Sequence, residues 1–236
     1  MRTTSAALIL IISLTVPAIA GPFEDVTNAF NRGDYKTAYR LIKPLADQGL
    51  PIAQYNLGIM YYNGQGVRQD YAEAVKWFRK AADQGDADAQ FKLGVMYTLS
   101  QGVPQDHAQA VRWFRKAADQ GDADSQSNLG LMYYNSKGVS QDYVEAVKWF
   151  RKAADQGDAD AQFILGLMYA KGEGVPQDYV QAHMWMNLAS SRYPASEKER
   201  REKAEKNRDI AASKMTPAQI SEAQRLTRKW KPKKVQ

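Results

Sequence analysis

One segment of the sequence occurs three times at a fixed spacing, and this repetition limits the folds available to the chain. Residues Ala74–Phe91 recur unchanged as Ala146–Phe163, and a near copy begins at Ala110. Tryptophans and glycines mark the same 36-residue period: Trp77, Trp113, Trp149, Trp185, Gly58, Gly94, Gly130 and Gly166. A fixed period of this size predicts a solenoid, in which each repeat buries its apolar face against the next.

Each repeat reads as two helices joined by a loop that contains glycine. In the first repeat Ala53, Leu57, Met60 and Tyr61 form one apolar stripe of a helix, and residues 71–82 repeat the pattern. Gly58 and its copies fall inside the first helices, where glycine costs about 1 kcal/mol relative to alanine. This repeated cost predicts close packing of another helix there, under the large Trp77-type side chain, with the tryptophans as core anchors.

Aspartates and glycines punctuate these helices. An aspartate precedes each second helix, at Asp70, Asp106, Asp142 and Asp178. Glutamate or glutamine follows three residues later, at Glu73, Gln109, Glu145 and Gln181, as in a reciprocal capping box. The second helices of the first three repeats are expected to stop at Gly85, Gly121 and Gly157, and the next helices to be capped by Asp86, Asp122 and Asp158. These aspartates are therefore expected to cap helices rather than to catalyse.

The pattern as a whole resembles a known family. Its elements in the first repeat are Ala53, Leu57, Gly58, Tyr61, Gly64, Gly66, Val67, Asp70, Ala74, Trp77, Ala81, Ala82 and Gly85. They are similar to a Sel1-like repeat of the secreted bacterial type, a relative of the tetratricopeptide repeat. Ser100 and Ser136 depart from the pattern, in place of the first loop glycine. The resemblance implies an all-α fold, an α/α solenoid with a right-handed superhelix of antiparallel helix pairs and a concave face built from first helices.

The N-terminus is typical of a secretory signal peptide. Arg2 precedes an apolar run from Ala6 to Val16, and the triplet Ala18–Ala20 then favours cleavage before Gly21. An uncleaved anchor is the rival interpretation, but the run is short of the roughly 20 residues that span a membrane. No cysteine is present for a lipoprotein route. We therefore expect a periplasmic or secreted protein with no transmembrane segment after signal cleavage.

The expected domains follow from these observations. Residues 1–20 form the signal peptide, 21–50 an N-terminal capping helix pair, 51–191 four Sel1-like repeats, and 192–236 basic C-terminal capping helices with a tail. Within the last segment, Ser196 and Thr216 are the expected caps of two helices, and the residues after Trp230 are expected to be frayed and solvated.

Charge and composition bear on the class of function. Residues 192–236 hold 14 Lys/Arg against 6 Asp/Glu, a net charge of +8 that leaves −2 for residues 1–191. The chain lacks cysteine, and its two histidines, His107 and His183, form no metal-binding pair. No Gly-x-Ser-x-Gly or Ser-x-x-Lys motif is present. We expect no catalysis, no cofactor and no metal. A β-lactamase-like penicillin-binding protein resembles this chain only in the repeat.

A binding role remains, and the family resemblance implies a scaffold or adaptor for peptides or proteins. Comparison of the repeats separates positions that never change from positions on the first helix that do. The expected ligand groove consists of Tyr55, Tyr62, Asn63, Phe91, Tyr134 and Asn135. The alternative interpretation is structural: some of these tyrosines only cover the next repeat. The alternative function is binding of an envelope polymer, peptidoglycan or an anionic glycan, through the basic tail; nucleic acid is not an expected partner, because export separates the tail from it.

Overall fold

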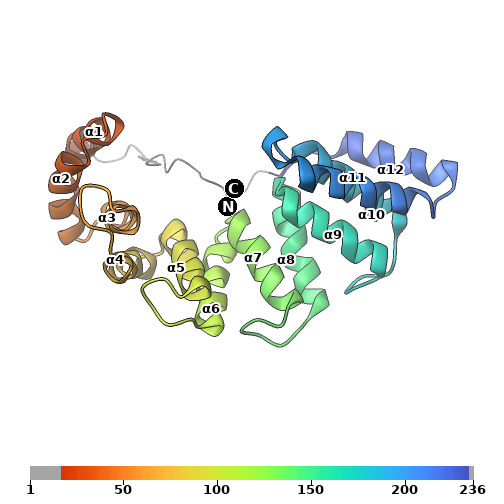
Figure 1. Cartoon of the computed structure of the whole chain (residues 1–236), viewed down its shortest axis with the longest axis horizontal. Helices are drawn as coiled ribbons and strands as arrows, with labels where there is room; N and C mark the ends of the chain where they lie inside the picture. The colour runs from red at the N-terminus through yellow and green to blue at the C-terminus, as the bar shows by residue number, and fades with distance from the viewer. Residues whose placement is uncertain (1–16, 234–236) are drawn as a thin grey trace. The chain divides into compact units, whose positions relative to one another are not determined.

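A computed structural model describes residues 17–233, and all regular structure within that range is helical (Figure 1). The helices are α1 (Pro17–Asn31), α2 (Tyr35–Asp47), α3 (Pro51–Asn63), α4 (Tyr71–Asp83), α5 (Ala87–Leu99), α6 (His107–Asp119), α7 (Ala123–Tyr134), α8 (Tyr143–Gln156), α9 (Ala159–Lys171), α10 (Tyr179–Arg192), the short 3₁₀ turn η1 (Ala195–Glu197), α11 (Lys198–Ala212) and α12 (Pro217–Lys229). The all-α prediction of successive helix pairs is confirmed.

The chain divides into two compact units. The N-terminal unit extends to Trp113 and the C-terminal unit begins at Phe114, so the division falls inside α6. In the N-terminal unit α3 packs on α4, and in the C-terminal unit α7 packs on α8 and α9 on α10.

The predicted aspartate caps are present, but the reciprocal half of the capping box is not. The Asp70 carboxylate accepts a hydrogen bond from the Glu73 amide at 3.0 Å, and Asp142 does the same for Glu145. The side chains of Glu73 and Glu145 turn outward instead and pair with the lysines one turn on, Lys76 and Lys148. Of the residues expected to cap the next first helices, Asp86, Asp122 and Asp158 also cap as predicted.

The helix glycines Gly58, Gly130 and Gly166 do not pack against tryptophan, which corrects the sequence prediction. A Cβ on Gly58 would lie 2.7 Å from the Phe78 ring, and one on Gly130 would lie 2.8 Å from the Phe150 ring. In the fourth repeat a Cβ on Gly166 would lie 2.8 Å from the Met186 side chain. The physical reason is one step of helical register: the residue after each tryptophan points at the preceding helix. The glycine therefore makes room for a phenylalanine ring in two of these repeats and for a methionine in the fourth.

The tryptophans are buried, as predicted, and two carry a lysine on their outer face. Exposure of the four repeat tryptophans lies between 3% and 8%. The ammonium group of Lys80 lies 3.8 Å from the centre of the Trp77 ring, and that of Lys152 lies 4.0 Å from the Trp149 ring. The Trp77 and Trp149 indoles thus act as core anchors with a cation over the outer face of the ring.

The loop glycines have a role that the repeat pattern alone did not reveal. Gly66 has a positive φ of 74°, and a Cβ there would lie 2.1 Å from the Tyr35 carbonyl oxygen at the start of α2. Gly174 approaches the Tyr143 carbonyl in the same way. Each such loop therefore rests on the first turn of the preceding second helix, and any side chain would separate them.

The N-terminal helices α1 and α2 pack on the first helix of the first repeat. Phe23, Val26, Ala29 and Phe30 of α1 are buried against α2 and α3. Helix α1 begins before the predicted cleavage point, and residues 1–16 of the predicted signal peptide lie outside the described residues. Among the described helices none is long and apolar enough to cross a membrane.

The C-terminal segment differs from the prediction at two points. Ser196 lies within the 3₁₀ turn η1, and α11 starts at Lys198 without a side-chain cap. Thr216 forms the predicted capping box with Gln219. Lys233 is not frayed: its backbone amide donates to the Asp155 carbonyl at 2.8 Å, and its ammonium pairs with the Asp155 carboxylate at 2.7 Å. The start of the tail is thus held at the end of α8 by this complementary charge.

Candidate functional site

The first helices present a water-facing stripe at steps of four, three and four residues. On α7 it consists of Asp124, Asn128, Leu131 and Asn135, the last at the helix end, and on α9 of Asp160, Ile164, Leu167 and Lys171. We call these eight residues the first-helix stripe. Its central positions are half-buried, and three of the four are aliphatic: Leu131, Ile164 and Leu167. A surface of this kind can bind an apolar partner.

Of the predicted groove residues, Tyr62 and Tyr134, near the ends of α3 and α7, make contacts within the scaffold. The Tyr62 hydroxyl donates to the Gln101 side chain at 3.0 Å, and its ring meets the Tyr71 ring edge-on at 5.1 Å. Tyr134 repeats this arrangement, with its hydroxyl donating to Glu173 at 2.9 Å. Burial raises the pKa of Tyr134, and the Glu173 carboxylate raises it further. Both tyrosines therefore link a first helix to the loop of the following repeat.

Of the other predicted residues, only the two asparagines are more accessible than these tyrosines. Asn63 and Asn135 are exposed at the ends of α3 and α7. The Asn135 amide donates to the Leu131 carbonyl at 3.0 Å, which leaves its side-chain oxygen as an acceptor. Tyr55 and Phe91 are half-buried, and the Tyr55 ring lies 5.7 Å from that of Phe78. Tyr55, Tyr62, Asn63 and Phe91 belong to the N-terminal unit, whereas Tyr134 and Asn135 belong to the C-terminal unit.

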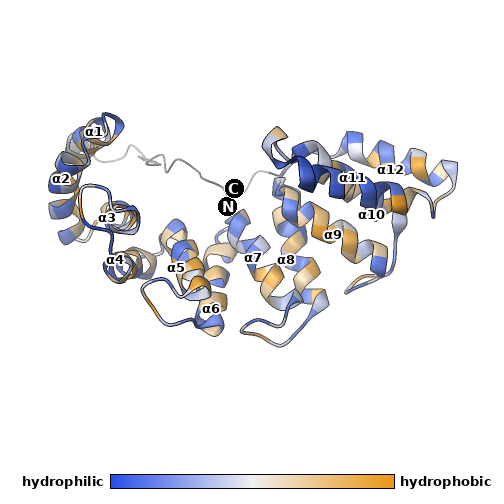
Figure 2. Ribbon diagram, in the orientation of Figure 1, coloured by the Kyte–Doolittle hydropathy of each residue, from blue (hydrophilic) through white to orange (hydrophobic). Residues whose placement is uncertain are grey.

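A cleft of about 290 Å³ opens in the C-terminal unit beside the first-helix stripe. It is lined by Leu131, Asp160, Phe163, Ile164, Tyr193, Arg200 and Lys203, from α7, α9, α11 and the chain after α10. Leu131, Phe163 and Ile164 form an apolar floor. Figure 2 shows α11 as almost entirely hydrophilic beside the more hydrophobic α9. The cleft therefore joins an apolar surface to a charged rim.

The rim is held by a compact set of polar contacts. The buried Tyr193 hydroxyl donates to Asp160 at 2.8 Å, and the Arg200 guanidinium donates to both Asp160 oxygens at 3.1 and 2.9 Å. Burial, with Asp160 alongside, raises the pKa of Tyr193, and Asp160 raises that of Arg200. Tyr193 therefore stays neutral and Arg200 charged at physiological pH. Asp160 and Arg200 neutralise each other.

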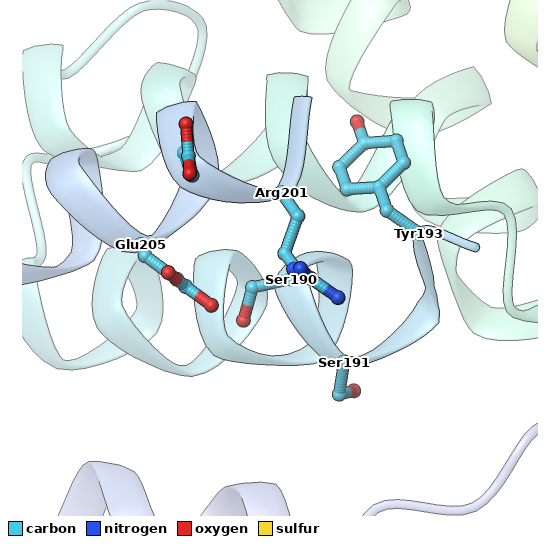
Figure 3. A pocket seen from close by; sticks show the side chains of 6 residues that line it. Ser190, Ser191, Tyr193, Arg201 and Glu205 are labelled. Carbon is cyan, nitrogen blue, oxygen red and sulfur yellow. The ribbon is translucent and has the colours of Figure 1, made fainter. Parts of the chain in front are cut away.

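A second pocket, of about 500 Å³, shares Tyr193 with the cleft (Figure 3). It is lined by Ser190, Ser191, Tyr193, Arg201, Glu202 and Glu205. In Figure 3 the Arg201 side chain extends from α11 toward Ser190 of α10. This lining is almost wholly polar and offers little apolar surface to bury. We therefore take the 290 Å³ cleft as the stronger candidate.

Neither histidine belongs to these pockets. His183 is buried at 5% exposure, and burial together with Arg208 lowers its pKa. His107 is half-buried at the start of α6. Among residues 17–233 no group of three His, Asp or Glu side chains gathers in the way that metal ligands do.

The cleft was not predicted from the sequence, although one signal was available. Ile164 occupies a position where the other repeats have Asn56, Lys92 and Asn128, so the scaffold does not require an apolar residue there. From the sequence, the rim residues Arg200 and Lys203 belong only to the expected basic C-terminal capping helices. No repeat period reaches them, and their position beside α9 depends on how α11 packs.

This fold defines an α-helical repeat protein whose first helices carry the variable surface. Residues 51–86, 87–122, 123–158 and 159–193 each match the Sel1 repeat, and the chain belongs to the Sel1 repeat family. Sel1 repeat proteins generally act as protein-interaction scaffolds and are typically non-catalytic.

Two solved structures are similar to the chain. A protective antigen present in uropathogenic Escherichia coli strains, displaying an SLR fold, is 38% identical with a TM-score of 0.72, covering 82% of this chain and 40% of the antigen. A Sel1 repeat protein from Oxalobacter formigenes is 40% identical with a TM-score of 0.62, covering 69% of this chain and 47% of that one. The chain thus spans less than half the length of each. No curated protein matches it.

Proposed function

We propose that this chain is a non-catalytic scaffold that binds a peptide or a protein partner through the exposed faces of its first helices. The observation that carries the proposal is the accessible aliphatic centre of the first-helix stripe, Leu131 and Leu167, flanked by amide and charged side chains. The amides of Asn128 and Asn135 can accept hydrogen bonds from the backbone of an extended ligand. Asn63 and Phe91 are the corresponding candidates in the N-terminal unit.

The test compares two aliphatic surfaces of one unit. Leu131→Asp and Leu167→Asp place charges on the stripe, whereas Val144→Asp places one on α8, where Val144 is 63% exposed. Partner capture from a bacterial envelope extract, followed by cross-linking and mass spectrometry, should be lost in the stripe variants and kept in the Val144→Asp variant. Circular dichroism melting of each variant establishes that it folds. Equal capture by all folded variants would remove the stripe as the binding surface.

We further propose that the partner is met in the periplasm or outside the cell. Cleavage before Gly21 would keep Phe23, Val26, Ala29 and Phe30, the buried residues described in α1, because these follow the cut. N-terminal sequencing of exported protein should therefore begin at Gly21. A mature chain that retains Met1 would contradict the export proposal.

The envelope-polymer alternative assigns binding to residues 192–236. Several cations of this segment already have partners in the chain, such as Arg225 with Glu222 and Lys233 with Asp155. Polymer binding through the segment should disappear at high ionic strength, whereas apolar contacts with the stripe should persist. Binding of peptidoglycan sacculi at low and high salt separates the two functions.

A further inference from the structure

The floor of the 290 Å³ cleft is more apolar than the scaffold requires. Ile164 replaces the polar residues Asn56, Lys92 and Asn128 of the other repeats, and Phe163 beside it remains half-exposed. Phe163 rests on a small buried cluster of Ala159, Ala189, Tyr193 and Ala204. Binding of an apolar group over this floor is favourable, because it removes apolar surface from water.

The rim carries one cation without a carboxylate partner. Arg200 is compensated, because it donates two hydrogen bonds to Asp160 and also lies 3.4 Å from a Glu197 carboxylate oxygen. The Lys203 ammonium lies 5.6 Å from the centre of the Phe163 ring and pairs with no carboxylate among the described residues. A ligand with a negative charge beside its apolar part would therefore complement the cleft.

The dimensions favour a peptide side chain over a cofactor. Sites for small molecules and cofactors usually range from roughly 300 to 1,000 Å³, so about 290 Å³ is at the lower limit. One large aliphatic side chain with its backbone fits this space. The cleft is also continuous with the α7 part of the first-helix stripe through Leu131, which both surfaces share. An extended chain can thus leave the cleft along Asn128 and Asn135.

We propose that the cleft binds an extended peptide segment, seating a large aliphatic side chain on Leu131, Phe163 and Ile164 and an Asp or Glu side chain beside Lys203. This rests on the proposed binding function and names the ligand chemistry of one part of it. Leu131 and Ile164 provide the apolar contact, Lys203 selects the acidic neighbour, and the fixed pair of Asp160 and Arg200 keeps the rim in place.

A positional-scanning library of random peptides, acetylated and amidated so that no terminal charge contributes, tests the proposal. Peptides that bind the wild-type chain should be enriched in Leu, Ile or Met next to Asp or Glu. The best peptide is then measured by fluorescence anisotropy against Ile164→Asn, which installs the residue of two other repeats, and Lys203→Glu. Each variant should weaken binding by about tenfold or more. Lys206→Glu makes the same charge change on α11 outside the cleft lining and should change affinity less than about twofold.

The outcomes separate this proposal from the wider one. Enrichment of basic or purely polar peptides, or peptides that bind Lys203→Glu and Ile164→Asn as tightly as wild type, would overturn the cleft while leaving peptide binding elsewhere intact. Binding that appears only when the same peptides are prepared with a free C-terminal carboxylate would overturn the acidic side chain as the recognised group. No binding by any peptide would overturn the proposal, whereas capture of a folded protein through Leu167 would still stand.

Discussion

The packing between the Sel1 repeats and the packing of the C-terminal helices use different chemistry. Between repeats, an arginine of a second helix donates to a tyrosine hydroxyl of the following first helix, as in Arg79 with Tyr97 and Arg151 with Tyr169. Beneath these bonds lie fully buried rings such as Phe150. By contrast, α11 and α12 bury only Ala204, Ala211 and Ala223 in full. The C-terminal helices thus bury small alanines, pack Leu226 and Trp230 against the core, and add polar contacts such as that of Arg208 with Asn187.

The change begins inside the fourth repeat, at positions where its residues leave the period. Gln156 donates to the Gln126 side chain, and Gln84 does the same to Gln54. The next residue in this series is Arg192, which instead lies over the Trp230 ring at 4.2 Å. The side-chain oxygen of buried Gln162 is consequently left without a hydrogen bond. Departures from the period thus mark where the repeat surface is adapted to a cap.

The largest expected change in stability comes from disrupting the interior packing of the repeats. Phe150→Ala should lower the free energy of unfolding by about 3 to 5 kcal/mol, because it empties a fully buried aromatic site. Equilibrium denaturation in urea measures the change. A loss below about 1 kcal/mol would mean that Gly130 and its neighbours collapse into the space. The packing between repeats would then contribute no more to stability than the packing of the C-terminal helices.

A smaller effect is expected at the cap. The half-buried Trp230 ring stacks against Arg192 and meets the Trp185 ring at 6.5 Å, so Trp230→Ala should cost about 1 to 2 kcal/mol. Hydrogen exchange of α12 should increase while that of α8 stays slow. Equal acceleration in both helices would show that cap and repeats unfold as one body, which would remove the distinction.

The repeat region could be predicted in detail because its physical requirements recur. Glycine at a positive φ appears at Gly85, Gly121 and Gly157, as expected from the ends of the apolar turns. The seat of Phe78 on Gly58 was assigned to the wrong side chain, since the period fixes which residues are invariant but not which of two neighbouring rings points inward. That direction depends on helix register, which is a tertiary property.

The candidate site was predictable only in part. Unequal positions on the first helices predict a binding surface there, and the structure shows that Asn135 is exposed on the first-helix stripe. Tyr134 was expected to be available to a ligand, but its hydroxyl bonds to Glu173 in the following loop. Arg200 and Lys203 come from a helix that occurs once, so no comparison of repeats could place them beside α9.

A third variant, His183→Val, tests through the pH dependence of stability how the fourth repeat differs from the other three. His183 stands where the other repeats have Val75, Val111 and Val147, and its pKa is lowered by burial and by Arg208. Because the unfolded chain then binds the proton more readily, stability should fall as pH drops below about 6.5. His183→Val should remove this part of the slope and raise stability by about 1 kcal/mol, more at pH 5 than at pH 7. Thermal melts of both proteins across this range measure it, and parallel curves would show that His183 is not the titrating group.

The smallest effect concerns two loops inside the repeats. Ser100 and Ser136 hold positive φ values of 57° and 56° where the first and fourth repeats have Gly64 and Gly172. A left-handed conformation costs a residue with a Cβ roughly 1 kcal/mol more than glycine, and this is offset in part by the greater freedom of glycine in the unfolded chain. Ser100→Gly and Ser136→Gly should therefore each stabilise the chain by about 0.5 kcal/mol. Ser140→Gly is the control, since Ser140 shows no positive φ and glycine there should bring no gain. If the control stabilised the chain equally, backbone strain would not explain the effect, and the serine loops would be equivalent to the glycine loops.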